Sequence, residues 1–304
     1  MHPATRTAAV LAATGAGGVG YAMAEARSYR LRRVDVPVLD PGQRPLRVLH
    51  VSDLHLLPQQ TKKIAWVRRL AELEPDLVVD TGDNLAGYYS VAPVLDALEP
   101  LLRLPGVFVF GSNDYVAPTR RNPFMYFRPN GSAHGIRRPE DFHADAELPW
   151  RDLRAGLVSG GWRELTNARA SVVVDGRRID AVGVDDPHIR RDRYAEVSAP
   201  ADPAADLTLG VAHAPYQRVL DGMSRDGADL VLAGHTHGGQ LRVPLSPAAI
   251  VTNCDLPRGQ ARGLSRWGGS WLHVSAGLGT SPYVRVRFAC PPEATLLTLV
   301  PREE

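Results

Sequence analysis

Cysteine and net charge are both scarce in this sequence, and each scarcity excludes a class of protein. Cys254 and Cys290 are the only cysteines among 304 residues, so the chain can form neither a disulfide framework nor a cysteine-based metal motif. The formal net charge of +2 at pH 7 argues against stable nucleic-acid binding, because such proteins usually carry a stronger basic excess. A metal site in this chain must therefore use histidine, aspartate and neutral oxygen ligands.

Long hydrophobic runs are also missing, with one exception near the N-terminus. Residues 8–24 carry no charge, follow Arg6 and precede a basic stretch, and their length is at the lower limit for a membrane span. We therefore divide the chain into an N-terminal apolar segment (1–30) and one domain (31–304). Three interpretations of the segment remain open: a membrane anchor, a signal peptide or a soluble helix. An anchor predicts membrane association with the domain on the cytoplasmic side, and the alternative is a cytoplasmic protein.

After the N-terminal segment, short apolar stretches alternate with longer helical patterns. Strands are predicted at 46–52, 76–82, 107–111, 171–175, 179–185, 207–213, 229–235, 271–277 and 295–300, and helices at 61–73, 90–102, 147–159 and 215–226. Nearly continuous runs of valine and leucine are typical of strands that are buried on both faces. The pattern therefore predicts a layered α/β fold.

Side chains able to bind metal follow five of the predicted strands directly. They are Asp53, His55, Asp83, Asn113, His213, His235 and His237. In an extended chain, residues two positions apart point to the same side. The Asp-x-His pair and the His-x-His pair are therefore each expected to present two ligands together. The carboxyl ends of strands are where α/β folds place their sites. The sequence therefore predicts one metal site built from all five strand ends.

The order of these motifs resembles that of a known family. Asp-x-His, Gly-Asp, a Gly-Asn-like turn, a lone histidine and Gly-His-x-His together resemble the calcineurin-like metallophosphoesterases, and GHTHGGQ looks most like their bacterial membrane-associated branch (YkuE/YaeI-like). The resemblance extends from about residue 46 to 300. It implies a layered αββα fold, in which a central β-sandwich is flanked by helices and two metal ions lie at the sandwich edge.

The resemblance also implies a role for each ligand. The first metal would be bound by Asp53, His55 and His237, the second by Asn113, His213 and His235, and Asp83 would bridge the two. A set this rich in imidazole suits Mn, Fe, Zn or similar ions better than Mg or Ca. The implied function is a dinuclear metal-dependent phosphoesterase, in which a metal-bound hydroxide attacks a phosphomonoester, phosphodiester or pyrophosphate, a lipid-linked substrate being one option.

One turn departs from the family pattern. The family usually has Gly-Asn-His-Asp or Gly-Asn-His-Glu, whereas this chain has Gly-Ser-Asn-Asp at 111–114. Without a gap, Ser112 takes the ligand position; with a slip of one residue, Asn113 remains the ligand and Asp114 replaces the catalytic histidine. An amide carbonyl is a better ligand than a neutral hydroxyl, which favours Asn113 and Asp114 as catalytic residues. The missing histidine leaves a second interpretation open, a catalytically weakened metal-binding scaffold.

The remaining residues to be assigned a role lie in the connection at 116–146 and at three further histidines. Arg120 and Arg121 lie in this long, arginine-rich connection and are predicted to bind an anionic substrate, a solvated loop being the alternative. His50 and His273 lie within apolar strand patterns and are predicted to be buried core residues. His188 is predicted to lie in a turn, with a substrate contact as the alternative.

Overall fold

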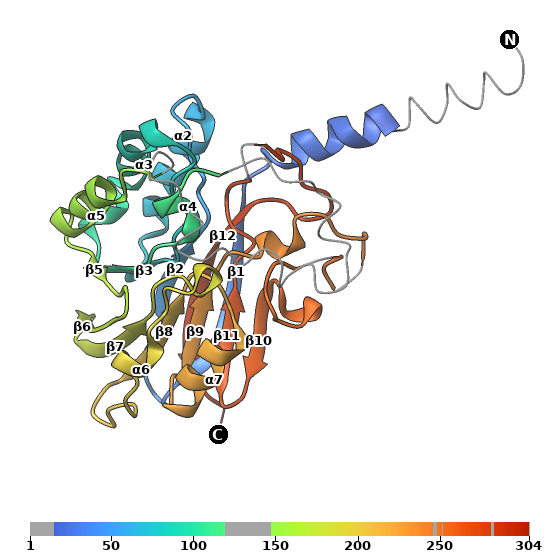
Figure 1. Ribbon diagram of the computed structural model, residues 1–304. Helices are drawn as coiled ribbons and strands as arrows, with labels where there is room; N and C mark the ends of the chain where they lie inside the picture. The colour runs from blue at the N-terminus through green and yellow to red at the C-terminus, as the bar shows by residue number, and fades with distance from the viewer. Residues whose placement is uncertain (1–14, 119–146, 246–247, 251, 281–282, 304) are drawn as a thin grey trace, which may run out of the picture.

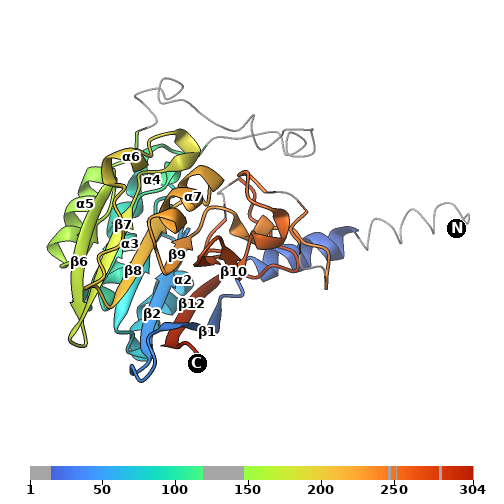
Figure 2. The same cartoon turned by 90° about the horizontal axis from the view of Figure 1, so that it is seen from below.

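Two β-sheets lie face to face between two layers of helices in the computed structural model of the chain (Figure 1; Figure 2). The structure describes residues 15–118, 147–245, 248–250, 252–280 and 283–303. The layered αββα fold expected from the sequence is confirmed.

The first sheet carries the strands that lead into the first three motifs. Its strands, in spatial order, are β1 (Arg30–Leu39), β12 (Glu293–Pro301), β2 (Leu46–Val51), β3 (Leu77–Asp80), β4 (Gly106–Phe108) and β5 (Arg163–Glu164). Neighbours from β2 to β5 run parallel, so the carboxyl ends of β2, β3 and β4 meet at one edge of the sheet.

The second sheet carries the strands that lead into the histidine motifs. Its strands, in spatial order, are β10 (Gly263–Trp267), β11 (Ser270–Val274), β9 (Leu230–Ala233), β8 (Leu207–Ala212), β7 (Arg177–Gly183) and β6 (Ala168–Val174). Neighbours from β11 to β7 run parallel. Their carboxyl ends therefore also share one edge, and the site described below brings this edge together with that of the first sheet.

Helices cover the outer face of each sheet. The first sheet packs against α2 (Thr61–Arg68), α3 (Val91–Leu98) and α5 (Trp150–Ser159), and the second against α6 (Tyr194–Val197) and α7 (Gln217–Arg225). The short α4 (Ser112–Tyr115) follows β4. Single 3₁₀ turns are η1 (Arg69–Leu73), η2 (Tyr88–Ser90), η3 (Leu101–Arg103), η8 (Pro187–Ile189), η9 (His237–Gly239) and η10 (Arg258–Gln260).

Alternating side chains on β2 show how the core is layered. Leu46 and Val48 pack between the two sheets, whereas Leu49 and Val51 pack under the outer helices, as the two-residue period of a strand requires. All four are buried, and burial of such a side chain contributes about 1.5–3 kcal/mol. Because both faces of the strand are covered, the loop that follows β2 is anchored on both sides.

Two differences from the sequence-based expectations have clear physical causes. Strand β1 has no counterpart among the predicted strands, because three arginines and Pro37 interrupt its apolar pattern. It lies at the edge of its sheet, where β12 is its neighbour. The helix predicted at 90–102 is too long, since α3 ends at Leu98 and η3 starts at Leu101. Pro100, between them, has no N–H to continue the helical hydrogen bonds.

The N-terminal segment ends in a helix over residues 15–25 that packs on the loops near β12. The Glu25 carboxylate accepts hydrogen bonds from the backbone N–H groups of Ala289 and Cys290 (3.1 and 2.8 Å), and the Tyr21 ring contacts Phe288. Within the part of the chain that the structure describes, no helix has both the length and the apolar character needed to cross a bilayer.

Candidate metal centre

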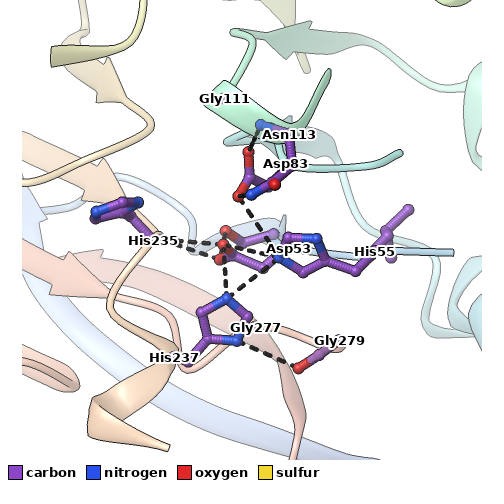
Figure 3. A network of polar contacts seen from close by, with 12 residues as sticks. Asp53, His55, Asp83, Gly111, Asn113, His235, His237, Gly277 and Gly279 are labelled. Atoms are coloured by element: carbon purple, nitrogen blue, oxygen red, sulfur yellow. Dashed lines mark hydrogen bonds and ion pairs between the residues drawn. The ribbon is translucent and has the colours of Figure 1, made fainter. Parts of the chain in front are cut away.

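Six of the seven predicted ligands form two compact groups at the shared edge of the sheets. Figure 3 labels five of these six, Asp53, His55, Asp83, His235 and His237. Asp53, His55 and His237 make up the first group, and Asp83, His213 and His235 the second. Within each group the candidate ligand atoms lie within 4.8 Å of one another. Both groups draw on both sheets, so the sandwich must be folded before either can form.

Asp83 lies between the two groups. Its Oδ2 is 3.5 Å from His55 Nε2 in the first group and 3.4 Å from His213 Nε2 in the second. Burial alone would raise the pKa of Asp83, but His213 and His55 beside it hold that pKa well below its ordinary value. One charged carboxylate oxygen therefore faces both groups, which is one of the ways in which a carboxylate can be shared by two cations.

The imidazoles of the first group face one another through their Nε2 atoms. His55 Nε2 lies 3.2 Å from His237 Nε2, and His237 Nε2 lies 3.6 Å from Asp53 Oδ1. Burial lowers the pKa of His55 to about 4 and that of His237 well below its ordinary value. Neutral imidazole is the form that binds metal, so this donor set fits a cation.

The second group is oriented by a backbone hydrogen bond. His213 Nδ1 lies 2.7 Å from the carbonyl oxygen of Thr81, which makes Nδ1 the donor and directs Nε2 towards the site. Nε2 then lies 3.2 Å from His235 Nδ1. Such a second contact fixes the ring of a metal-binding histidine and increases its basicity.

Backbone strain is concentrated at the candidate ligands. Asp53, His55, Asp83, His235 and His237 have φ angles of 50°, 38°, 58°, 68° and 50°. Residues other than glycine rarely adopt positive φ, and each such residue costs on the order of 1–3 kcal/mol. Strain of this kind persists only where the surrounding structure enforces it, and it is typical of functional sites.

Two glycines leave room for the ligands. A Cβ atom on Gly111 would lie 2.2 Å from Asp83 Oδ1, and one on Gly234 would lie 1.9 Å from Ser52 Oγ and 2.6 Å from Asp53 Oδ2. Any side chain at either position would displace a candidate ligand. The glycines of the Gly-Ser-Asn-Asp and Gly-His-Thr-His motifs are thus required by close approach.

Asn113, the seventh predicted ligand, lies against Asp83. Its backbone N–H donates to Asp83 Oδ1 (2.8 Å) and its side-chain Nδ2 donates to Asp83 Oδ2 (2.6 Å). The structure therefore brings Asn113 to the metal centre. The oxygen of its side-chain amide is the atom that could bind a cation.

Asp114 lies behind the site and is fully buried. Oδ2 accepts from the N–H groups of Asp83 and Gly111 (2.8 and 3.0 Å), and Oδ1 accepts from those of Asn84 and Leu85 (2.8 and 3.0 Å). These bonds fasten the loop that carries Asp83 to the start of α4. Arg120 and Arg121, the predicted substrate-binding pair, lie outside the described residues.

A buried hydrogen-bonded chain leads from the sandwich interior to Asp53. Its members, in order, are His273, His50, Thr81, Ser52 and Asp53, and the successive distances are 3.0, 3.0, 2.7 and 2.5 Å. His50 and His273 are buried, as the sequence indicates. Their connection to a candidate ligand could not be foreseen, because it joins strands of different sheets.

Two further residues contact the histidines and were not predicted to do so. The ring of His188, after β7, lies 4.3 Å from that of His235, and its Nδ1 is 3.0 Å from Tyr216 Oη. The buried Arg287 guanidinium lies 3.2 Å from His237 Nδ1 and donates to the carbonyls of residues 276, 277 and 279. The position of His188 could have been inferred from the sequence, since it follows β7, which ends at the same edge of the sheet. No sequence pattern indicates the position of Arg287.

Comparison with known proteins identifies the family. The calcineurin-like phosphoesterase family matches residues 46–239. The chain is 28% identical to phosphodiesterase YaeI of Escherichia coli, over 97% of this chain and 96% of that protein. It is 26% identical to YpbG of Bacillus subtilis, over 98% of each chain.

A zebrafish relative, named transmembrane protein with metallophosphoesterase domain, is 30% identical over 72% of this chain and 47% of its own length. The family match covers more than half of this chain and all five motif-bearing strand ends. The chain therefore belongs to the calcineurin-like phosphoesterases and is a metal-dependent hydrolase of phosphate esters.

Proposed function

We propose that this chain is a dinuclear phosphodiesterase. Asp53, His55 and His237 would hold one divalent ion, and His213, His235 and the carbonyl oxygen of Asn113 the other, with Asp83 shared between them. The position of Asp83 Oδ2, within 3.5 Å of a histidine nitrogen from each group, carries this proposal. The name of the E. coli relative, phosphodiesterase YaeI, supports a diester substrate.

The chemistry of the donor set fits such ions. Burial lowers the pKa of His55, His235 and His237, and such imidazoles with carboxylates that face them are ligands for Mn, Fe or Zn. Nearby carboxylates, Asp83 first, hold the pKa of His213 above its ordinary value, and a cation in place of the imidazole proton would balance the buried charge of Asp83. When bound, two divalent ions lower the pKa of water and neutralise phosphoryl charge. The chain itself contributes fixed ligands. The strained backbone, the hydrogen bond that the Thr81 carbonyl accepts from His213 and the one that Ser52 donates to Asp53 hold them in place.

For Asp114 we propose a positioning role instead of proton donation to the leaving group. Both of its oxygens accept backbone N–H bonds, so neither is directed at a substrate by these contacts. Asn113, by contrast, contacts Asp83 through its side chain. The substrate-binding role of Arg120 and Arg121 stays a prediction.

Chelation tests the proposed function. Protein prepared with Mn is expected to hydrolyse bis-p-nitrophenyl phosphate, to lose at least about 100-fold in rate after exhaustive chelation, and to regain it with Mn, since metal ions supply several kcal/mol of transition-state stabilisation. Elemental analysis should find two ions per chain in the active form. Turnover that survives complete metal removal, or a fully active form with one ion, would contradict the proposal.

We further propose that residues 1–30 attach the domain of residues 31–304 to a membrane. The uncharged run at 8–24 and the zebrafish relative's name support this. The full chain is expected to sediment with membranes, because its apolar segment partitions into lipid. A chain that begins at Gly20 keeps the Tyr21 and Glu25 contacts and should remain in the supernatant with equal activity. A full chain that stays in the supernatant with Met1 intact would disprove attachment.

A further inference from the structure

A pocket of about 570 Å³ is lined in part by loops that also carry candidate metal ligands. Its lining consists of Leu57, Gln59, Ala86, Gly87, Ala117, Pro118, Tyr283 and Arg285. Ligand pockets usually measure about 300–1,000 Å³, so its size suits a small organic group. None of these eight residues belongs to the metal centre itself.

Three loops each provide both a candidate metal ligand and part of the pocket wall. Leu57 lies two residues after His55, Ala86 three after Asp83, and Ala117 four after Asn113. An extended residue spans about 3.3 Å, so these walls lie within about 7–13 Å of the candidate ligands. The pocket is therefore close enough to hold a group that is covalently attached to a phosphate at the metal centre.

Hydrogen bonds keep these loops in fixed register. The N–H of His55 donates to the carbonyl of Asp83 (2.9 Å), and the N–H of Leu56 to that of Asn84 (2.9 Å). Leu56 and Leu85 form a parallel bridge, and Asp114 ties the third loop to the second. The distance from metal centre to pocket is thus set by backbone geometry.

The fourth wall is tied to the last motif. Gln240, three residues after His237, donates from Nε2 to the carbonyls of Val284 and Val286 (3.0 and 2.8 Å). This contact holds the segment that contains Tyr283. All four sides of the pocket are consequently connected to loops that carry candidate ligands.

The pocket wall combines apolar and polar groups. Leu57, Ala86, Ala117, Pro118 and Tyr283 provide its apolar part, and Gln59 and Arg285 its polar part. The 3₁₀ turn η2 follows Gly87 directly and exposes Tyr88 and Tyr89 by 64% and 80%, while Tyr283 is 50% exposed. Exposed aromatic side chains beside a pocket are typical of a binding surface.

We propose that this pocket binds the apolar body of the non-reacting ester group, so that the substrate is an amphiphilic phosphate diester. The proposal rests on the proposed phosphodiesterase function. Water would add to phosphorus and one ester oxygen would leave with its own group, while the second ester group, which stays on phosphorus, lies in the pocket. We infer a substrate group as the occupant because all four pocket walls are connected to loops that carry candidate metal ligands.

A series of p-nitrophenyl alkyl phosphate diesters tests this inference. Methyl, butyl and octyl esters share one leaving group, so differences in kcat/KM report binding of the alkyl chain. A buried methylene is worth about fourfold, and kcat/KM for octyl is expected to exceed that for methyl by at least about tenfold in the Mn-loaded full chain.

Pocket variants locate the effect. Ala117→Trp fills the pocket and should collapse the octyl-to-methyl ratio towards one. Tyr283→Asp, at a half-exposed position that tolerates a polar side chain, should lower the ratio as well. Val173→Trp on the far edge strand β6, where Val173 is 69% exposed, is the matched control and should keep the wild-type ratio.

Each outcome has a distinct meaning. Turnover of all three esters with a flat ratio would overturn the pocket assignment and leave the phosphodiesterase function standing. A ratio that stays high in both Ala117→Trp and Tyr283→Asp would place the alkyl chain elsewhere and overturn it too. No turnover of any ester, with two ions bound, would instead refute the proposed function. If Ala117→Trp fails to fold, Tyr283→Asp decides.

Discussion

Replacing Asp83 with asparagine is expected to reduce turnover of bis-p-nitrophenyl phosphate by about 1,000-fold or more, where each tenfold corresponds to about 1.4 kcal/mol. The change removes the charge from a carboxylate oxygen that faces a histidine of each group of candidate ligands. Oδ2 of Asp83 lies 3.5 Å from His55 and 3.4 Å from His213. Asparagine keeps the shape of the side chain but carries no charge with which to hold two cations together.

Metal content and stability separate this effect from misfolding. Asp83→Asn should bind at most one ion per chain by elemental analysis. Without metal, the variant is expected to melt below the wild type, because the folded chain holds the pKa of Asp83 below its ordinary value and both of its oxygens accept hydrogen bonds from Asn113. A circular dichroism spectrum like that of the wild type would show that the variant is nevertheless folded. Asp152→Asn, at an exposed position in the first turn of α5, removes the same charge and should change neither property. Two retained ions with nearly full turnover would refute the bridging role.

Sequence alone predicts the location of this centre because its ligands follow strand ends. The strand period does not explain their orientation, since Asp53, His55, His235 and His237 have positive φ angles and are not extended, and His235 and His237 lie in different groups. Parallel strands also bring their carboxyl ends to one edge, so five separate motifs converge once the strand order is known. The family resemblance adds which ligand belongs to which group, and the grouping in the structure agrees with it apart from Asn113, which lies against Asp83.

The rest of the fold escapes sequence reasoning where local patterns compete with tertiary contacts. The edge strand β1 has the composition of a basic linker, and its strand conformation depends on pairing with β12, more than 260 residues away. The hydrogen-bonded chain through His50 and His273 joins two sheets, so no local pattern encodes it. The same is true of the pocket, whose walls come from four loops that are adjacent only in the folded chain.

The Gly-Ser-Asn-Asp turn provides the second large effect. If the side-chain carbonyl of Asn113 binds the second ion, Asn113→Ala should weaken binding of that ion and lower turnover by at least about 100-fold, since residues that only orient metal ligands are already worth about 10–100-fold. Ser112→Ala is the matched control at the neighbouring position, and it should keep both ions and most of the activity. If Ser112→Ala loses metal while Asn113→Ala does not, the ungapped alignment is right and the assignment of Asn113 is wrong.

Asp114→Asn distinguishes positioning from proton donation. Burial raises the pKa of Asp114 to about 8. Each carboxylate oxygen nevertheless accepts two backbone N–H bonds, so a proton on either oxygen would face two N–H donors. Asparagine accepts at one oxygen only, so its NH₂ group would confront two N–H groups and destabilise the folded chain by roughly 2–4 kcal/mol, the cost of leaving such buried donors unsatisfied. The melting temperature should therefore fall, and turnover of esters with good and poor leaving groups should fall by the same factor.

A proton donor at Asp114 would give a different kinetic result. General acid catalysis is worth about 10²–10⁴-fold and matters most when the leaving group is a poor one. Asp114→Asn would then slow an alkyl phosphate diester far more than bis-p-nitrophenyl phosphate, while both ions stayed bound and the melting temperature stayed near that of the wild type. The ratio of the two rate losses, measured together with the melting temperature, decides between the roles, because a displaced Asp83 loop impairs every substrate whereas a missing proton impairs only those that need one.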